Sequence, residues 1–326
     1  MQRLVVFGDS NILASRMLLE AVCKAVKQSK DLEIVAFCDS TLMRPLGDFV
    51  RSLRLRSVST IKWLFNSEYR ASLEYMVTSS FRRLGNQFNV PVIRPPQQNI
   101  NHPEFINHIR QELKADFALS CICLQLFSPE LLQVFSVAVN YHNGLLPKYR
   151  GLKATGWSIY FKEESTGFTF HLMTEGIDDG RILLQDAIPV EANDSLYETE
   201  IKKTLKAGER IGEVLQMMLD GKTGISQTGD FSYFSSKDFR TITTIEDPSQ
   251  HTAHELLHRL KSFEGLSIRI GDKIYQVTKL AKVEDSSTPK KGLEFLTHDG
   301  VKMKPTRFHF MPWWLYVLYS LIRFPS

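Results

Sequence analysis

Polar side chains that could support acyl-transfer chemistry gather at the end of an apolar run in mid-chain. Residues 137–139 (VAV) are typical of a buried strand, and Asn140 and His142 follow directly. Because side chains alternate across a strand, we expect these two to project from the same face at its end. Pro147 then forces the chain out of the sheet. Strand ends of this kind are where open α/β sheets build binding sites.

A carboxylate follows a second short strand. Residues 167–173 (GFTFHLM) predict the strand, and the loop 175–180 (EGIDDG) carries Asp178 and Asp179. An amide and an imidazole could stabilise an oxygen that becomes negative during acyl transfer. A carboxylate beside the histidine could accept the proton lost by an attacking amine, and we expect it to raise the pKa of His142.

Together these pieces resemble the folate-dependent formyltransferases, which include glycinamide ribonucleotide, methionyl-tRNA and sugar-nucleotide N-formyltransferases. The resemblance rests on Asn140-x-His142, then residues 145–151 (LLPKYRG), then residues 177–180 (IDDG), in that order. It covers roughly residues 3–221. It implies that Asn140 and His142 donate hydrogen bonds to the oxyanion and that Asp178 accepts the proton, with Asp179 as the alternative.

The resemblance also implies the substrates. It implies 10-formyltetrahydrofolate as the formyl donor and no metal. It places the pterin against two loop segments, through Leu124, Gln125, Leu126, Phe127, Thr174, Gly176 and Ile177. For the acceptor we favour the primary amine of a nucleotide-linked amino sugar, because strings usual in the methionyl-tRNA branch are missing. Methionyl-tRNA is the alternative, and the intact Asn140, His142 and Asp178 argue against a non-catalytic binding module.

The surrounding elements predict an α/β fold with a doubly wound, mostly parallel sheet. Apolar runs at 4–7, 32–38, 90–93, 117–126 and 137–141 alternate with helical patterns ending near 27, 114 and 219. A chain of 326 residues fits two domains. We expect a catalytic domain over 1–222 and a smaller β-rich domain over 223–308. The latter should contain a helix near 249–263 and a hairpin turning at Gly271-Asp272.

Two segments depart from the family's outline. Residues 41–86 are basic with interleaved aromatics, which predicts either an amphipathic helical pair or contact with a nucleotide diphosphate, tRNA or membrane surface. Residues 309–326 predict an apolar aromatic helix too short to span a bilayer. This helix would pack on protein, in a homodimer for example, or lie at a membrane interface.

Composition and decoy motifs narrow the class of protein. A net charge of +4 does not demand nucleic acid, and the four cysteines lack metal spacing, as in a reducing compartment. Without a signal peptide or spanning segment we expect a cytoplasmic enzyme, peripheral at the inner face of a membrane if the tail binds lipid. Residues 254–258 (HELLH) match a zinc-protease string, but no third ligand follows, so we expect no zinc.

Overall fold

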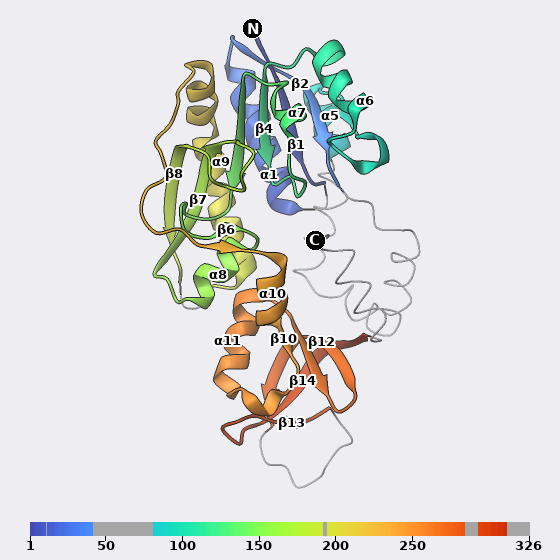
Figure 1. Ribbon diagram of the computed structural model, residues 1–326, viewed down its shortest axis with the longest axis vertical. Coiled ribbons are helices and arrows are strands. Elements are labelled where there is room, and N and C mark those ends of the chain that lie inside the picture. The colour runs from blue at the N-terminus through green and yellow to red at the C-terminus, as the bar shows by residue number, and fades with distance from the viewer. Residues whose placement is uncertain (11, 42–80, 192–193, 284–292, 312–326) are drawn as a thin grey trace. The chain divides into compact units, whose positions relative to one another are not determined.

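The computed structural model describes residues 1–10, 12–41, 81–191, 194–283 and 293–311, and its elements are drawn in Figure 1. The chain forms two compact units. Unit 1 comprises Met1–Arg150, Gly167–Ile188 and Glu200–Phe231, and unit 2 comprises Gly151–Thr166, Pro189–Thr199 and Ser232–Ser326. Each unit is assembled from separate stretches of chain. The expected domain boundary after residue 222 therefore remains a prediction.

Unit 1 is built on a seven-stranded sheet with the order β3-β2-β1-β4-β5-β7-β8. The pairs β1/β2, β2/β3, β1/β4 and β4/β5 are parallel, whereas β5/β7 is antiparallel. This confirms the predicted doubly wound, mostly parallel α/β fold. The strands are β1 (Gln2–Gly8), β2 (Leu32–Asp39), β3 (Val92–Ile93), β4 (Phe117–Cys121), β5 (Val137–His142), β7 (Ser165–Leu172) and β8 (Ile182–Pro189).

Both faces of this sheet are buried. Along β1, Leu4 and Val6 enter one apolar core while Val5 and Phe7 enter a second, and all four are fully buried. Helices α1 (Leu13–Gln28), α5 (Phe81–Phe88) and α9 (Leu196–Leu219) supply the first core. Helices α6 (Pro103–Asn107), η2 (His108–Leu113) and α7 (Pro129–Leu132) supply the second. Burial on both faces explains why these strands read as continuous apolar runs.

The strand expected over 117–126 is wrong at its second half, because β4 ends at Cys121. Ile122 adopts a left-handed backbone (φ 65°), which is rare for a β-branched residue and takes the chain out of the sheet. Gln125 then ties the following loop to unit 1, since its amide donates to the Ser40 carbonyl at 2.9 Å. Leu124 and Leu126 are 60% and 66% exposed, so the apolar run that predicted a buried strand lies partly at the surface.

Unit 2 contains the β-rich region predicted in the C-terminal part. A five-stranded sheet has the order β10-β11-β12-β14-β13. Ile270 pairs with Lys273 across the predicted turn, and Gly271 supplies its left-handed residue (φ 62°). The remaining elements are β6 (Arg150–Gly151), α8 (Ala154–Tyr160), β9 (Tyr233–Phe234), α10 (Ser236–Thr243), β10 (Thr244–Ile245), η3 (Pro248–Gln250), α11 (Ala253–Phe263), β11 (Leu266–Ile270), β12 (Lys273–Lys282), β13 (Phe295–Leu296) and β14 (Lys302–Met311), with η1 (Pro96–Gln98) in unit 1.

Two predicted segments fall largely outside the described residues. These are the basic insertion, of which 42–80 are not described, and the C-terminal helix, of which 312–326 are not described. The roles expected for them stay predictions. Within the described part of the chain, no helix combines the length and the apolar character needed to cross a membrane.

Candidate active site

The end of β5 presents the two side chains that the sequence singled out. Val139 and Tyr141 point into the first apolar core, where Tyr141 packs against Phe170 with ring centroids 5.4 Å apart. The alternation of the strand therefore turns Asn140 and His142 to the opposite face, as predicted. His142 is buried and Asn140 is half-buried. Their shared direction is fixed by the aromatic packing behind them.

The antiparallel neighbour β7 adds a residue that the sequence reasoning missed. In the β5/β7 register, Asn140 lies opposite His171 and His142 lies opposite Thr169. His171 is buried, and its Nε2 lies 3.2 Å from the Asn140 Nδ2. The sequence contained a sign of this, because Phe168 and Phe170 alternate with Thr169 and His171. This alternation indicates that His171 lies on the face of the strand opposite to the two phenylalanines. The pairing that puts His171 beside Asn140 comes from the tertiary structure alone.

The loop after β7 carries Asp178 into this group. Its carboxylate Oδ2 lies 3.3 Å from His142 Nδ1, and its Oδ1 lies 3.4 Å from His171 Nε2. The same Oδ1 lies 3.4 Å from the amide nitrogen of Asn140. Asp178 is 11% exposed, so one carboxylate faces two imidazoles and an amide in a mostly buried setting.

Two features fix the backbone of this loop. Asp178 has a left-handed conformation (φ 52°), which Asp tolerates better than most residues. The Gln227 side-chain amide donates to the carbonyls of Asp178 and Gly180, each at 2.8 Å. At Gly180, a Cβ atom would lie 1.7 Å from the Leu172 carbonyl oxygen, so only glycine permits this close approach to β7.

Asp179 is engaged elsewhere. Its carboxylate accepts a short hydrogen bond from the Thr174 hydroxyl within the loop, and the residue is exposed. The geometry thus brings Asp178, and not its neighbour, to Asn140 and His142. The catalytic roles of all three remain predictions.

The ionisation of His142 differs from expectation. Burial lowers the pKa of the His142 imidazole, and this effect outweighs the opposing influence of the Asp178 carboxylate. The Asp178 carboxylate does act to raise this pKa, as expected, but the desolvation of the ring, which was not visible in the sequence, outweighs it. This shift favours the neutral ring. Its Nε2 lies 2.8 Å from the Tyr149 carbonyl, which calls for a proton there.

The tautomer of His171 follows in the same way. Its Nδ1 lies 2.9 Å from the Leu172 carbonyl oxygen, an acceptor that requires Nδ1–H. Its Nε2 lies 3.2 Å from the Asn140 amide nitrogen and can accept a hydrogen bond from that amide when it carries no proton. His171 thereby fixes which end of the Asn140 side chain faces the site.

The residues after β4 that were expected to contact the pterin differ in their exposure. Leu124 and Leu126 are exposed, whereas the Gln125 side chain is turned inward to Ser40 and Ile100. Phe127 is buried, with its ring centroid 4.6 Å from that of Phe7, so its side chain belongs to the second core. The two leucines are the apolar side chains of this segment that remain accessible.

The second expected pterin segment is the loop after β7. Thr174 and Gly176 are exposed, and Ile177 is half-buried. A Cβ at Gly176 would lie 2.0 Å from the Asp179 carboxylate. The loop is therefore close-packed on itself and offers its backbone at the surface. The role of these residues remains a prediction.

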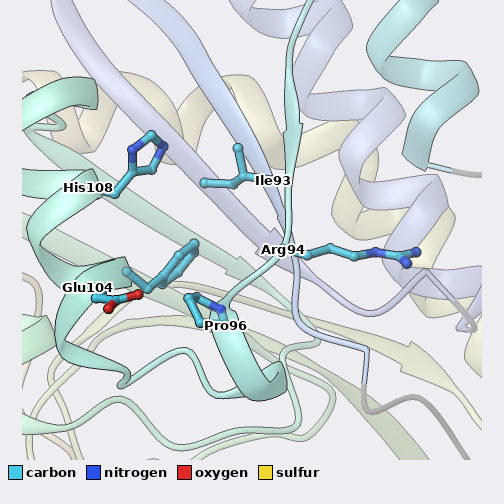
Figure 2. Close-up of a pocket in the computed structure, with 6 residues that line it drawn as sticks. Ile93, Arg94, Pro96, Glu104 and His108 are labelled. Carbon is cyan, nitrogen blue, oxygen red and sulfur yellow. The ribbon is translucent and has the colours of Figure 1, made fainter.

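Two cavities of unit 1 lie away from this group. The cavity in Figure 2 has a volume of about 280 Å³ and is lined by Ile93, Arg94, Pro96, Glu104, Phe105 and His108. The Arg94 side chain points away from Glu104 and His108 in this view, and its guanidinium binds Asp39 at 2.8 Å. A second cavity of about 400 Å³ adjoins Arg82 and Arg94. Neither cavity is lined by Asn140, His142, His171 or Asp178.

The zinc-protease string lies on α11 in unit 2. The His258 Nε2 lies 2.9 Å from the Tyr160 carbonyl, and Glu255 pairs with Arg259 and with His251. Among the described residues, no group of three or more His, Cys, Asp or Glu side chains is arranged to hold a metal ion. Local hydrogen bonding accounts for these side chains. The expected absence of zinc stays a prediction.

A comparison of the sequence with protein families finds one family whose profile includes the residues of this site. A profile described as formyl transferase matches residues 74–214, which include Asn140, His142, His171 and Asp178. Over this stretch the chain is similar to the formyl transferase family. The resemblance suggested by the Asn-x-His, LLPKYRG and IDDG pieces is thus confirmed.

Individual relatives within the family cover different shares of the chain. A GDP-perosamine N-formyltransferase of Brucella melitensis biotype 1 is 39% identical over 98 residues, or 30% of this chain and 38% of its own length. The bifunctional polymyxin resistance protein ArnA of Wigglesworthia glossinidia brevipalpis is 30% identical over 190 residues, or 57% of this chain and 29% of its own length. A methionyl-tRNA formyltransferase of Clostridioides difficile is 26% identical over 230 residues, or 69% of this chain and 73% of its own length. The chain thus spans well under half of the first two relatives.

A solved structure shares the fold. The N-formyltransferase of Helicobacter canadensis, in complex with folinic acid and dTDP-3-aminofucose, superposes with a TM-score of 0.54 at 16% identity. The match covers 95% of this chain and all of that one. At this identity the likeness shows the fold of this chain and leaves its substrates open.

Proposed function

We propose that this chain is an N-formyltransferase that moves a formyl group from 10-formyltetrahydrofolate to the primary amine of a nucleotide-linked amino sugar. The observation that carries the proposal is the group of Asn140, His142 and His171 around Asp178 at the end of β5. The amino-sugar acceptor is supported by the GDP-perosamine N-formyltransferase relative. It is also supported by the neighbour solved with folinic acid and a dTDP-linked amino sugar.

The folate supplies the formyl group on its N10 nitrogen. The residues present are suited to hold such a molecule, because Leu124 and Leu126 expose apolar surface on the loop after β4. That strand pairs with β5, with Cys121 opposite Tyr141, so the loop and the Asn140–His142 pair follow adjacent parallel strands. Gln125, turned inward between the two leucines, fixes the loop on which they stand.

Asn140 serves as the donor to the formyl oxygen. During transfer a bond forms between the acceptor nitrogen and the formyl carbon, the bond from that carbon to N10 breaks, and the oxygen becomes negative in between. The Asn140 amide lies 3.4 Å from Asp178, a long contact that is easily exchanged for a stronger acceptor. His171 holds the same amide in the donor orientation. A donor of this kind contributes about 3–4 kcal/mol to comparable reactions.

His142 and Asp178 handle the proton. The amine loses one proton on attack, and N10 gains one as it leaves. Because His142 Nε2 faces the Tyr149 carbonyl, its Nδ1 is the nitrogen that faces the Asp178 carboxylate, 3.3 Å away, and one proton can lie between these two acceptors. This pair can take the amine proton and return it to N10, so no proton is left over.

The test is formyl transfer by the purified chain with 10-formyltetrahydrofolate. Acceptors should include dTDP-, UDP- and GDP-linked amino sugars and methionyl initiator tRNA, with mass spectrometry of the product. We expect one amino-sugar nucleotide to be formylated, and the D178N variant to transfer the formyl group at least about 10²-fold less efficiently. Formylation of the tRNA alone would replace the acceptor, an outcome that the longer match to a methionyl-tRNA formyltransferase makes worth testing. Folate binding without transfer to any acceptor would overturn the proposed reaction.

A further inference from the structure

A lysine on α9 is buried beside the site. Lys203 is fully buried, which is rare for lysine. Its Nζ donates a hydrogen bond of 2.5 Å to the carbonyl of Asn143, the residue that follows His142. The contact joins two parts of unit 1 that are 60 residues apart in the chain. Neither the sequence motifs nor the reaction above uses this side chain.

The same helix holds Asn143 a second time. Glu200, one turn before Lys203, accepts from the Asn143 amide at 3.4 Å. The next residue is also fixed, because the Thr169 hydroxyl donates to the Gly144 carbonyl at 2.7 Å. The backbone leaving His142 is thus fastened to α9 on one side and to β7 on the other. A shift at Asn143 would move the His142 ring relative to Asp178.

Burial lowers the pKa of Lys203 to about 7, and the Glu200 carboxylate opposes that shift. Tyr141 and Thr204 lie in the same region and form a hydrogen bond. The positive charge of Lys203 acts on His142 in the direction that lowers the imidazole pKa, alongside His171 and against Asp178. The cation therefore favours the neutral ring.

We propose that Lys203 is a positioning residue of the site: it anchors the backbone after His142 to helix α9 and, when protonated, acts on that imidazole as a nearby positive charge. The inference rests on the proposed function for its kinetic consequences only. The anchoring and the effect of the charge on His142 can be measured whether or not the chain transfers formyl groups.

The experiment compares K203M, which removes donor and charge, with K203R, which keeps both. K202M, at an exposed lysine on the same helix, is the matched control. The His142 ring is followed by NMR titration, with its signal assigned through H142Q. We expect K203M to raise the pKa of His142 by about 0.5 unit or more, since a nearby cation is lost. We expect kcat to fall about tenfold with KM unchanged, because the reacting groups are misplaced and not the substrates.

The outcomes separate the two proposals. An inactive wild-type protein would sink the proposed function, but an altered His142 titration in K203M would still support the role of Lys203. A folded K203M with the wild-type titration and kcat would overturn it. If K203M does not fold, K203Q, which lacks the charge but keeps a donor, is read by the His142 titration alone: a raised His142 pKa supports the proposal and an unchanged one overturns it. Failure of both to fold would make Lys203 a folding residue and would also overturn the proposal.

Discussion

At the scale of single residues, one carboxylate organises the site. Asp178 reaches His142, His171 and Asn140, whereas Asp179 stays within its loop. We therefore expect D178N to lower kcat/KM by about 10²–10⁴-fold, as loss of a proton acceptor does. D179N should stay within about tenfold of wild type, since it leaves that acceptor in place. Steady-state kinetics with circular dichroism as the folding control decides the ranking, and equal losses would contradict the assignment.

A second prediction concerns Asn140 and His142, the two site residues at the end of β5. N140A removes the amide proposed as the oxyanion donor, and H142A removes the ring that faces Asp178. Each should lower kcat by about 10²-fold or more with the fold intact. Single-turnover measurements of formyl transfer test this directly. Near-normal transfer by a folded H142A protein would rule out the proton pathway proposed above.

Mutation can distinguish the role of His171 from that of His108, which lies outside the site. Because the His171 Nε2 accepts from Asn140, H171A should let that amide rotate and should lower kcat about tenfold. H108A, which changes the lining of the cavity in Figure 2, should leave kcat within about twofold, since that cavity contains none of the site residues. Larger losses in H108A than in H171A would move the active site to that cavity.

At the scale of elements, the loop between β7 and β8 depends on a glycine. A Cβ at Gly180 would collide with the backbone of Leu172, whereas a Cβ at Gly212, on the exposed side of α9, would meet nothing within 4 Å. G180A should therefore destabilise the protein by about 1–3 kcal/mol and displace Asp178. G212A should stabilise it by roughly 0.5–1 kcal/mol, since alanine favours a helix interior. Thermal melts of both variants test the contrast, and a neutral G180A would contradict the close approach.

At the scale of the whole molecule, the buried Lys203 couples stability to pH. Its pKa is about 7 in the folded protein and 10.5 as a free side chain, so above pH 7 the unfolded state binds more protons. Stability must then rise with pH through this range, by up to about 1.4 kcal/mol per pH unit. From pH 7 to pH 9, wild type should gain roughly 2 kcal/mol relative to K203M. Urea unfolding of both proteins at the two pH values measures this difference, and a constant difference would show that Lys203 does not titrate in that window.

His142 affects the dependence of stability on pH at the acid end. Burial lowers the pKa of this ring in the folded state, so the unfolded chain takes up the proton first as the pH falls below 6.5. The stability associated with the neutral ring is therefore present above that value and is lost toward acid. Both buried groups therefore make the folded state more stable as the pH rises, His142 on the acid side and Lys203 above neutral pH.

The sequence by itself determined the fold class, the face shared by Asn140 and His142, and the order of the three family motifs. These properties depend on local periodicity and on residue types at short spacing, which need no knowledge of distant contacts. The hairpin at Gly271 was found for the same reason, since its turn and flanking strands are contiguous. The choice of Asp178 over Asp179 was a suggestion from family spacing that the geometry supports.

Only the tertiary structure decided which residues, distant in the chain, become neighbours in the folded protein. The β5/β7 register brings His171 to Asn140, and the packing of α9 brings the buried Lys203 to the carbonyl of Asn143. The early end of β4 likewise depends on the backbone at Ile122 and on the contacts of Gln125 with distant residues. The lowered pKa of His142 could not be read from its neighbours in the chain, because desolvation depends on all the atoms that exclude water from the ring.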